Sequence, residues 1–90
     1  MKQKIEIYYS HGNKYYCDKN GLAHREDGPA IEWADGSKEW YINGLNHRTD
    51  GPAAIFSNGA KYWYINGVQL TEEEFRHSTN RTCKLPNYLK

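Results

Sequence analysis

The chain has 90 residues and a formal net charge of +1, with twelve basic and eleven acidic residues interspersed along it. This balance argues against a nucleic-acid or membrane binder that relies on overall charge. Only 38% of the residues are hydrophobic but 14% are aromatic, so large rings must supply much of the core of one small domain. No apolar run has the length of a signal peptide or of a membrane span, and we expect a cytoplasmic location.

An internal repeat organises the chain. Residues 24–30 read His-Arg-Glu-Asp-Gly-Pro-Ala, and residues 47–53 read His-Arg-Thr-Asp-Gly-Pro-Ala. The offset of 47 − 24 = 23 residues also relates Trp40 to Trp63. A short fixed period is typical of structural units that stack on one another.

The period divides the chain, which we expect to form a single repeat domain over residues 1–90. An irregular N-terminal unit spans 4–29, and regular units span 30–52 and 53–67. A helical cap and tail occupy 68–90. Terminal units are commonly irregular because they close the stack.

The first unit opens with apolar and polar residues in alternation over 4–9, which predicts a strand. A turn follows at 10–13, and a second strand is expected at 15–17. Between Gly12 and Gly21 the chain is one residue longer than in the later units, which indicates a bulge or a longer turn.

The regular units each predict two strands joined by a tight turn. In the first of them, Asp35-Gly36 separates strands at 30–34 and 38–42. The corresponding strands of the next unit are expected at 54–56 and 62–65. The resulting fold class is all-β: a single-layer antiparallel meander of hairpin repeats with about six strands, estimated from the repeat count.

Alternation along these strands assigns each side chain to one of two sheet faces. The expected apolar face carries a buried layer shared by the two indoles and comprises Ile31, Trp33, Trp40, Ile42, Ala54, Phe56, Trp63 and Ile65. The expected opposite face is half polar and rich in tyrosine, and comprises Glu32, Glu39, Tyr41, Ile55, Tyr62 and Tyr64.

A short helix is expected at about residues 71–77, where the His-Arg segment does not recur. Thr71 and Glu74 have the spacing of a capping box, in which each side chain accepts the other residue's backbone N–H. Leu70 and Phe75 occupy the two positions of a hydrophobic staple. This helix should cover the end of the sheet.

The segment Trp40-Tyr41-x-Asn43-Gly44-x-x-His47-Arg48-x-Asp50-Gly51-Pro52-Ala53 resembles a repeat, W-Y-x-N-G-x-x-H-R-x-D-G-P-A, of small proteins from bacteriophages, giant viruses and some bacteria. Partial copies at 20–30 and 63–67 extend the resemblance over most of the chain. It is more distantly similar to the membrane occupation and recognition nexus (MORN) repeat, although that family usually places Gly after the His. The resemblance implies a twisted antiparallel meander, a viral origin and an action on a host protein in the host cytoplasm.

Two interpretations of the His-Arg segments remain open. In the structural one, Asp27-Gly28-Pro29 and Asp50-Gly51-Pro52 form tight turns, an Arg of one unit pairs with an Asp of the next, and each His bonds a neighbouring loop. In the functional one, four side chains on adjacent hairpins bind phosphate groups of a nucleotide or RNA. These four are His24, Arg25, His47 and Arg48.

Catalysis and metal binding are not expected. A histidine beside an aspartate could act as a general base, but no Ser or Cys nucleophile accompanies the repeat. The four His and two Cys lack the spacing of common metal sites. We therefore expect no enzyme, no metal and no cofactor.

The tyrosine-rich face is the leading candidate for a binding surface, because tyrosine is enriched at interfaces and a ninety-residue single layer cannot cover both of its faces. Its expected contact residues are Tyr41, Tyr62, Tyr64 and Ile55. The leading hypothesis is a non-catalytic module that binds and inhibits or recruits a host protein, with self-association into a dimer as a related outcome. The alternative is a phosphate, nucleotide or RNA binder that uses the His-Arg segments.

Overall fold

The computed structural model describes residues 4–79 of the chain and is mainly β, as expected. Seven strands form one antiparallel sheet in the order β1-β2-β3-β4-β7-β8-β9, and β5 and β6 form a separate two-stranded sheet. The strands are β1 (Glu6–Ser10), β2 (Asn13–Cys17), β3 (Ile31–Glu32), β4 (Lys38–Glu39), β5 (Tyr41–Ile42), β6 (Leu45–Asn46), β7 (Ala54–Ile55), β8 (Lys61–Ile65) and β9 (Val68–Leu70). One helix, α1 (Glu72–Thr79), follows β9.

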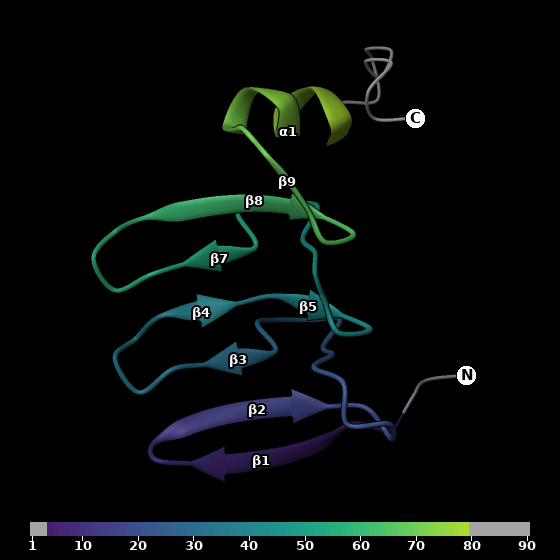
Figure 1. Cartoon of the computed structure of the whole chain (residues 1–90), viewed down its shortest axis with the longest axis vertical. Helices are drawn as coiled ribbons and strands as arrows, with labels where there is room; N and C mark the ends of the chain where they lie inside the picture. The colour runs from purple at the N-terminus through teal and green to yellow at the C-terminus, as the bar shows by residue number, and fades with distance from the viewer. Residues whose placement is uncertain (1–3, 80–90) are drawn as a thin grey trace.

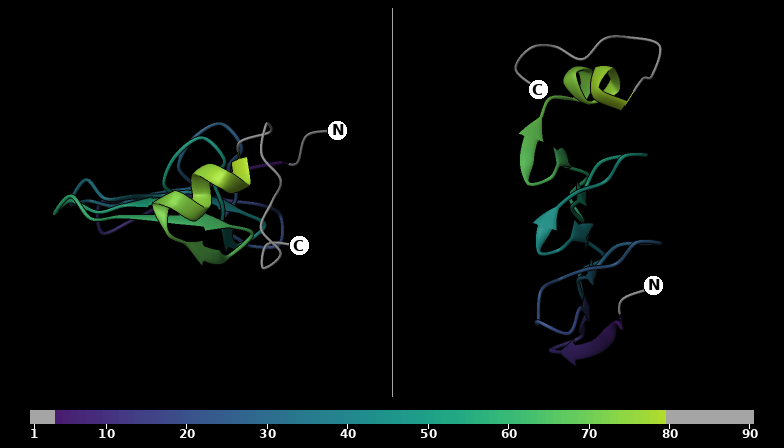
Figure 2. Two further views of the ribbon diagram at one scale, coloured as in Figure 1. Left: turned by 90° about the horizontal axis from the view of Figure 1, so that it is seen from above. Right: turned by 90° about the vertical axis from the view of Figure 1, so that its right-hand side faces the viewer.

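The molecule is a flat stack of hairpins, as Figure 1 shows. Its principal extents are 41 × 36 × 17 Å, and seven of the nine described strands lie in one continuous antiparallel sheet. The molecule is thin at the hairpin turns and thicker at the other ends of the strands, where the loops after β2 and β6 extend to one side (Figure 2). The expected single-layer antiparallel architecture with one short C-terminal helix is therefore confirmed.

The described strands number nine rather than six. The strand expected at 38–42 is divided at Trp40, because β4 pairs with β7 whereas β5 pairs with β6. Strands β6 and β9 were not expected, although each follows an Asn-Gly turn of the kind that joins hairpin strands.

The turns have the glycine positions that the sequence indicates. Asn43 and Gly44 both have positive φ, at 52° and 81°, as a two-residue type I′ hairpin turn requires. In the first unit, Asp18 instead closes a longer turn, and its carboxylate accepts the backbone N–H groups of Asn20 and Leu22. The extra residue of that unit is thus accommodated in a longer turn, one of the two outcomes that the spacing indicates.

A bulge in each regular unit places two consecutive small or branched residues in the core. Ile31 pairs with Glu39, and the backbone N–H of Ala30 also donates to the Glu39 carbonyl at 2.8 Å. Two residues on one strand therefore face one residue on the next, which defines a β-bulge. Ala53 and Ala54 have the same relationship to Tyr62. The buried apolar residues are Ala30, Ile31, Ala53, Ala54, Leu70 and Phe75.

The expected assignment of side chains to the two sheet faces is wrong, because the register between neighbouring strands differs by one residue from the expected register. Ile31 and Ala54 both pair with Glu39, so these three side chains lie on the same face. By alternation, Trp40 and Trp63 lie together on the opposite face. Both indoles are half-buried rather than part of a buried layer.

The capping box forms as expected at the start of α1. The Thr71 hydroxyl accepts the Glu74 N–H at 3.1 Å, and the Glu74 carboxylate accepts the Thr71 N–H at 2.9 Å. Leu70 and Phe75 are both buried, in agreement with a hydrophobic staple. The helix extends through residues 78 and 79, which were expected to begin the tail, and the rest of that tail, residues 80–90, lies outside the described residues.

Candidate functional site

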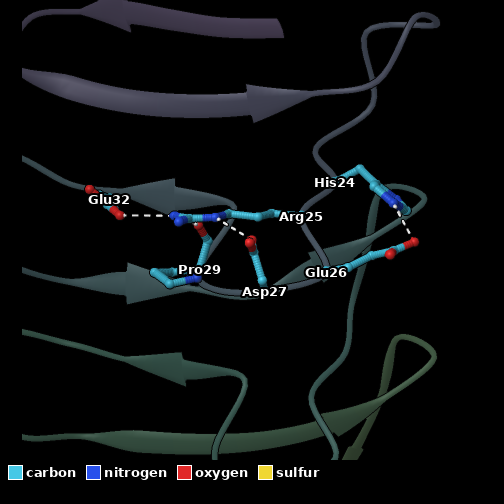
Figure 3. A network of polar contacts seen from close by, with 6 residues as sticks. All are labelled: His24, Arg25, Glu26, Asp27, Pro29 and Glu32. Carbon is cyan, nitrogen blue, oxygen red and sulfur yellow. Dashed lines mark hydrogen bonds and ion pairs between the residues drawn. The ribbon is translucent and has the colours of Figure 1, made fainter. Parts of the chain in front are cut away.

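The loop between β2 and β3 folds around the guanidinium group of Arg25 (Figure 3). Nε donates to the Asp27 carboxylate at 3.1 Å, and Nη1 donates to the carbonyl of Pro29 at 3.2 Å. Nη1 also lies 3.3 Å from the carboxylate of Glu32 on β3. One arginine therefore fixes both ends of the Asp-Gly-Pro turn and ties it to the sheet.

The same guanidinium group is held between an aromatic ring and a glycine. Its Cζ atom lies 4.0 Å from the ring centroid of Tyr16 on β2. On its other side, a Cβ atom placed on Gly28 would lie 2.8 Å from Cζ. A Cβ atom at position 28 would therefore require the guanidinium group to shift from these contacts.

Arg48 has the corresponding contacts in the loop between β6 and β7. It donates to the Asp50 carboxylate at 2.9 Å and to the Pro52 carbonyl at 3.1 Å, and its Cζ lies 4.0 Å from the Trp40 ring centroid. The Arg–Asp ion pairs thus form within one loop, and the expected pairing of an Arg with an Asp of the next unit is wrong. In place of Glu32, this unit has Ile55.

The histidine of each loop bonds the turn that comes after it along the stack. Nδ1 of His24 accepts the Asn43 N–H at 2.9 Å, and Nδ1 of His47 accepts the Asn66 N–H at 2.9 Å. An accepting Nδ1 leaves the proton of a neutral ring on Nε2. In His24, which is only 3% exposed, Nε2 lies 3.6 Å from the exposed carboxylate of Glu26. Both histidines contact a neighbouring loop, as the structural interpretation expects.

A groove of about 500 Å³ lies between the two loops and is lined by both arginines together with Glu26, Asp27 and Asp50. The guanidinium groups already bond aspartates and main-chain carbonyls. A phosphate would therefore have to displace these contacts and approach three carboxylates. This geometry favours the structural interpretation of the His-Arg segments over anion binding.

On the other face of the sheet, Glu39 accepts hydrogen bonds from two aromatic side chains. The Trp33 indole N–H and the Tyr41 hydroxyl each donate to a different oxygen of its carboxylate, both at 2.8 Å. Burial, and then the hydrogen bond to Glu39 and its charge, raise the pKa of Tyr41 to about 12. Trp33 and Glu39, which were assigned to opposite faces, therefore form one polar and aromatic group.

Further rings extend this group along the stack. Trp33 packs edge to face with Tyr15 on β2, at 5.9 Å between ring centroids. Phe56 packs in the same way with Tyr62 on β8, at 5.6 Å. We call this surface the aromatic face and define it by Tyr15, Trp33, Glu39, Tyr41, Phe56, Tyr62 and Tyr64.

Three of the four residues expected to bind a protein lie on the aromatic face, and the fourth does not. Tyr41 and Tyr64 are half-buried, and Tyr62 is 39% exposed. Ile55 pairs with Lys38 and Lys61, so its side chain points to the opposite face. Trp33 and Phe56 were missed as members of this surface because the expected strand register is displaced by one residue, and Tyr15 was assigned to neither face.

A hollow of about 370 Å³ opens on the aromatic face beside the hairpin turns. Its lining residues are Asn13, Trp33, Ala34, Asp35, Ser37, Glu39 and Phe56. One indole ring, one phenyl ring and two carboxylates thus border a shallow depression, which suits one inserted side chain of a partner better than a cofactor.

Within residues 4–79, no group of three or more His, Cys, Asp or Glu side chains is arranged to hold a metal ion. Cys17 is a free thiol, and burial together with the charges of Asp18 and Glu6 raises its pKa. A raised pKa reduces the thiolate fraction, so this geometry gives Cys17 no features of an activated nucleophile. No helix of the described part has the length and apolar character needed to cross a membrane.

Comparison of the chain with protein-family models, with curated proteins and with solved structures found no match.

Proposed function

We propose that the protein is a non-catalytic binding module that recognises another protein through its aromatic face. The observation that carries this proposal is the row of rings on one side of a single-layer sheet, with Tyr62 exposed to 39% and the others only half-buried. Tyrosine and tryptophan give large contact areas at a small cost in side-chain entropy, and are enriched at protein interfaces.

Glu39 supports this proposal because it holds two rings of the face in fixed positions. Its carboxylate accepts hydrogen bonds from Trp33 and Tyr41, so neither ring must be ordered when a partner binds. A surface arranged in advance loses less free energy on association than a flexible one. The edge-to-face pair of Phe56 and Tyr62 extends the fixed surface to the next hairpin.

The sequence resemblance described above extends this proposal to the class of partner. It supports a small viral protein that binds a host protein in the host cytoplasm and inhibits or recruits it. The aromatic face is compatible with that role, and the source of the support is the repeat motif alone.

Nucleotide or RNA binding by the His-Arg loops has less support. Arg25 and Arg48 are held by their own loops, and the groove between them also contains Glu26, Asp27 and Asp50. Binding of this kind would depend steeply on salt and would be lost on removal of either arginine.

Affinity capture from a host lysate tests the proposal with two neighbouring substitutions. Tyr62→Ala removes an exposed ring from the aromatic face, and Lys61→Ala removes an exposed side chain of the opposite face. We expect wild type and Lys61→Ala to retain a discrete protein after nuclease treatment, and Tyr62→Ala to lose it.

An Arg48→Ala variant separates the alternative from the proposal. If retention is lost with Arg48→Ala, with nuclease and with moderate salt but is unchanged in Tyr62→Ala, then the aromatic face is not the binding surface.

A further inference from the structure

Strand β1 forms one edge of the seven-stranded sheet, and all five of its residues are exposed. Ile7, Tyr8 and Tyr9 are exposed to 47%, 51% and 71%, although each is large and partly or wholly apolar. Exposed edge strands present unpaired backbone groups and are common sites of pairing with another chain. Charged or proline residues usually protect such edges, yet from Glu6 to Ser10 the only charge is that of Glu6.

The hydrogen bonds of β2 fix which backbone groups of β1 face outward. The N–H of Tyr16 donates to the carbonyl of Ala30, and the carbonyl of Tyr16 accepts the N–H of His24. Both backbone groups of Tyr16 therefore point away from β1. Its partner in the register is Ile7, whose N–H and C=O must therefore point to the open side. By alternation, the backbone groups of Ile5 and Tyr9 point to the same side.

We propose that β1 pairs with β1 of a second copy of this chain, antiparallel and about a two-fold axis at Ile7. In this register, Ile7 is hydrogen-bonded to Ile7 of the second copy, and Ile5 to Tyr9 of the second copy. All outward-facing backbone groups of these three residues are then paired, and the two sheets join into one.

The side chains are complementary in this register. On one face, it places the Ile7 side chains together and each Ile5 against a Tyr9 ring. On the other face, Glu6 lies opposite Tyr8 of the second copy, and a tyrosine hydroxyl already donates to that carboxylate within one chain at 2.6 Å. A shift by two residues toward the start of the strand would instead place Glu6 opposite Glu6, where like charges repel.

The opposite edge of the sheet favours a closed dimer over a fibre. Strand β9 has only three residues and leads through Thr71 into α1, which packs against β9 and β8. Pairing of β9 with β1 of another copy would be open-ended, whereas pairing of β1 with β1 consumes one edge from each copy and stops.

Sedimentation of charge variants at position 7 tests both the interface and its axis. Wild type should be dimeric. Ile7→Lys and Ile7→Glu should each raise the protein concentration at which half of the chains are dimeric by about tenfold or more, because identical charges meet at the axis. An equimolar mixture of the two variants should restore dimers, since the introduced lysine and glutamate then face one another. Val68→Lys, at an exposed position of the other edge strand, should remain dimeric.

Two results would overturn the proposal. One is a wild-type protein that stays monomeric up to about 100 µM, far above the dissociation constant of a stable dimer. The other is a dimer that the position 7 variants leave unchanged or that their mixture does not restore. Far-ultraviolet circular dichroism of each variant confirms that the hairpin is folded. The test is independent of the aromatic face, because Tyr62→Ala should not alter the dimer.

Discussion

The guanidinium group of Arg48 lies over the indole of Trp40, with Cζ 4.0 Å from the ring centroid, and Arg25 lies over Tyr16 at the same distance. Each arginine also bonds the aspartate and the proline carbonyl of its own loop. The two loops are therefore attached to one face of the sheet, and the rings of the other face remain available.

Gly51→Ala tests this attachment. The added Cβ would lie 2.9 Å from Cζ of Arg48, so the guanidinium group must shift from its position over the Trp40 ring. The φ angle of Gly51 is not positive, so the backbone itself accepts alanine. We expect the free energy of unfolding to fall by about 1–2 kcal/mol in urea titrations. In an Arg48→Ala background, the same change should cost less than about 0.5 kcal/mol; additive effects would show that the two residues do not interact.

His24→Ala should destabilise the protein by about 2 kcal/mol, because it leaves the N–H of Asn43 without its acceptor beside a buried position. His47→Ala should cost less, since the corresponding bond to Asn66 is exposed. Thermal or urea unfolding measures both. His24→Asn is the control, because its side-chain oxygen can replace Nδ1 and should recover part of the loss; equal costs for the alanine and asparagine variants would contradict this role.

Glu39→Ala should cost about 2 kcal/mol, because a half-buried carboxylate that accepts two hydrogen bonds is removed from between two aromatic donors. Glu32→Ala makes the same charge change on the adjacent strand and opposite face, where it removes the ion pair with Arg25. We expect that control to cost at most about 1 kcal/mol. Comparable urea midpoints for the two variants would argue against the arrangement around Glu39.

Alkaline pH should weaken the fold through Tyr41. Its pKa is raised from 10.0 to about 12, so the folded state retains a proton that the unfolded state loses in this interval. The free energy of unfolding should therefore fall as the pH rises from 10.0 to about 12. Urea titrations of Tyr41→Phe should show a shallower fall. Tyr8→Phe is the control for this fall in the free energy of unfolding. The hydrogen bond from its hydroxyl to Glu6 also raises the pKa of Tyr8, but its ring is exposed, so its removal should change the fall less than Tyr41→Phe does.

The local elements could be predicted from the sequence because short-range chemistry determines them. Gly44 follows Asn43 where two positive φ angles are needed, and Thr71 and Glu74 cap the helix as their spacing indicates. The role of the Asp-Gly-Pro turn could be predicted only in part. The turn was expected, but the arginine that fills the space beside its glycine was expected to pair with an aspartate of the next unit.

The face assignments failed for a reason that periodicity does not reveal. Alternation correctly relates Ile31 to Trp33 and Glu39 to Tyr41 within each strand, but says nothing about the register between strands. The structure pairs Ile31 with Glu39, and a shift of one residue exchanges the faces of a whole strand. Ala30, the added residue of the bulge, gives no distinct signal in the sequence.

Nuclear Overhauser contacts of the indole rings test the central claim, the division of the sheet into an aromatic face and an arginine face. We expect the Trp33 indole N–H to show contacts to the Glu39 side chain and the Tyr15 ring, and the Trp40 ring to show contacts to the Arg48 side chain. If Trp40 instead shows contacts to Glu39 and Tyr15, the two faces are exchanged and the proposed binding surface is contradicted.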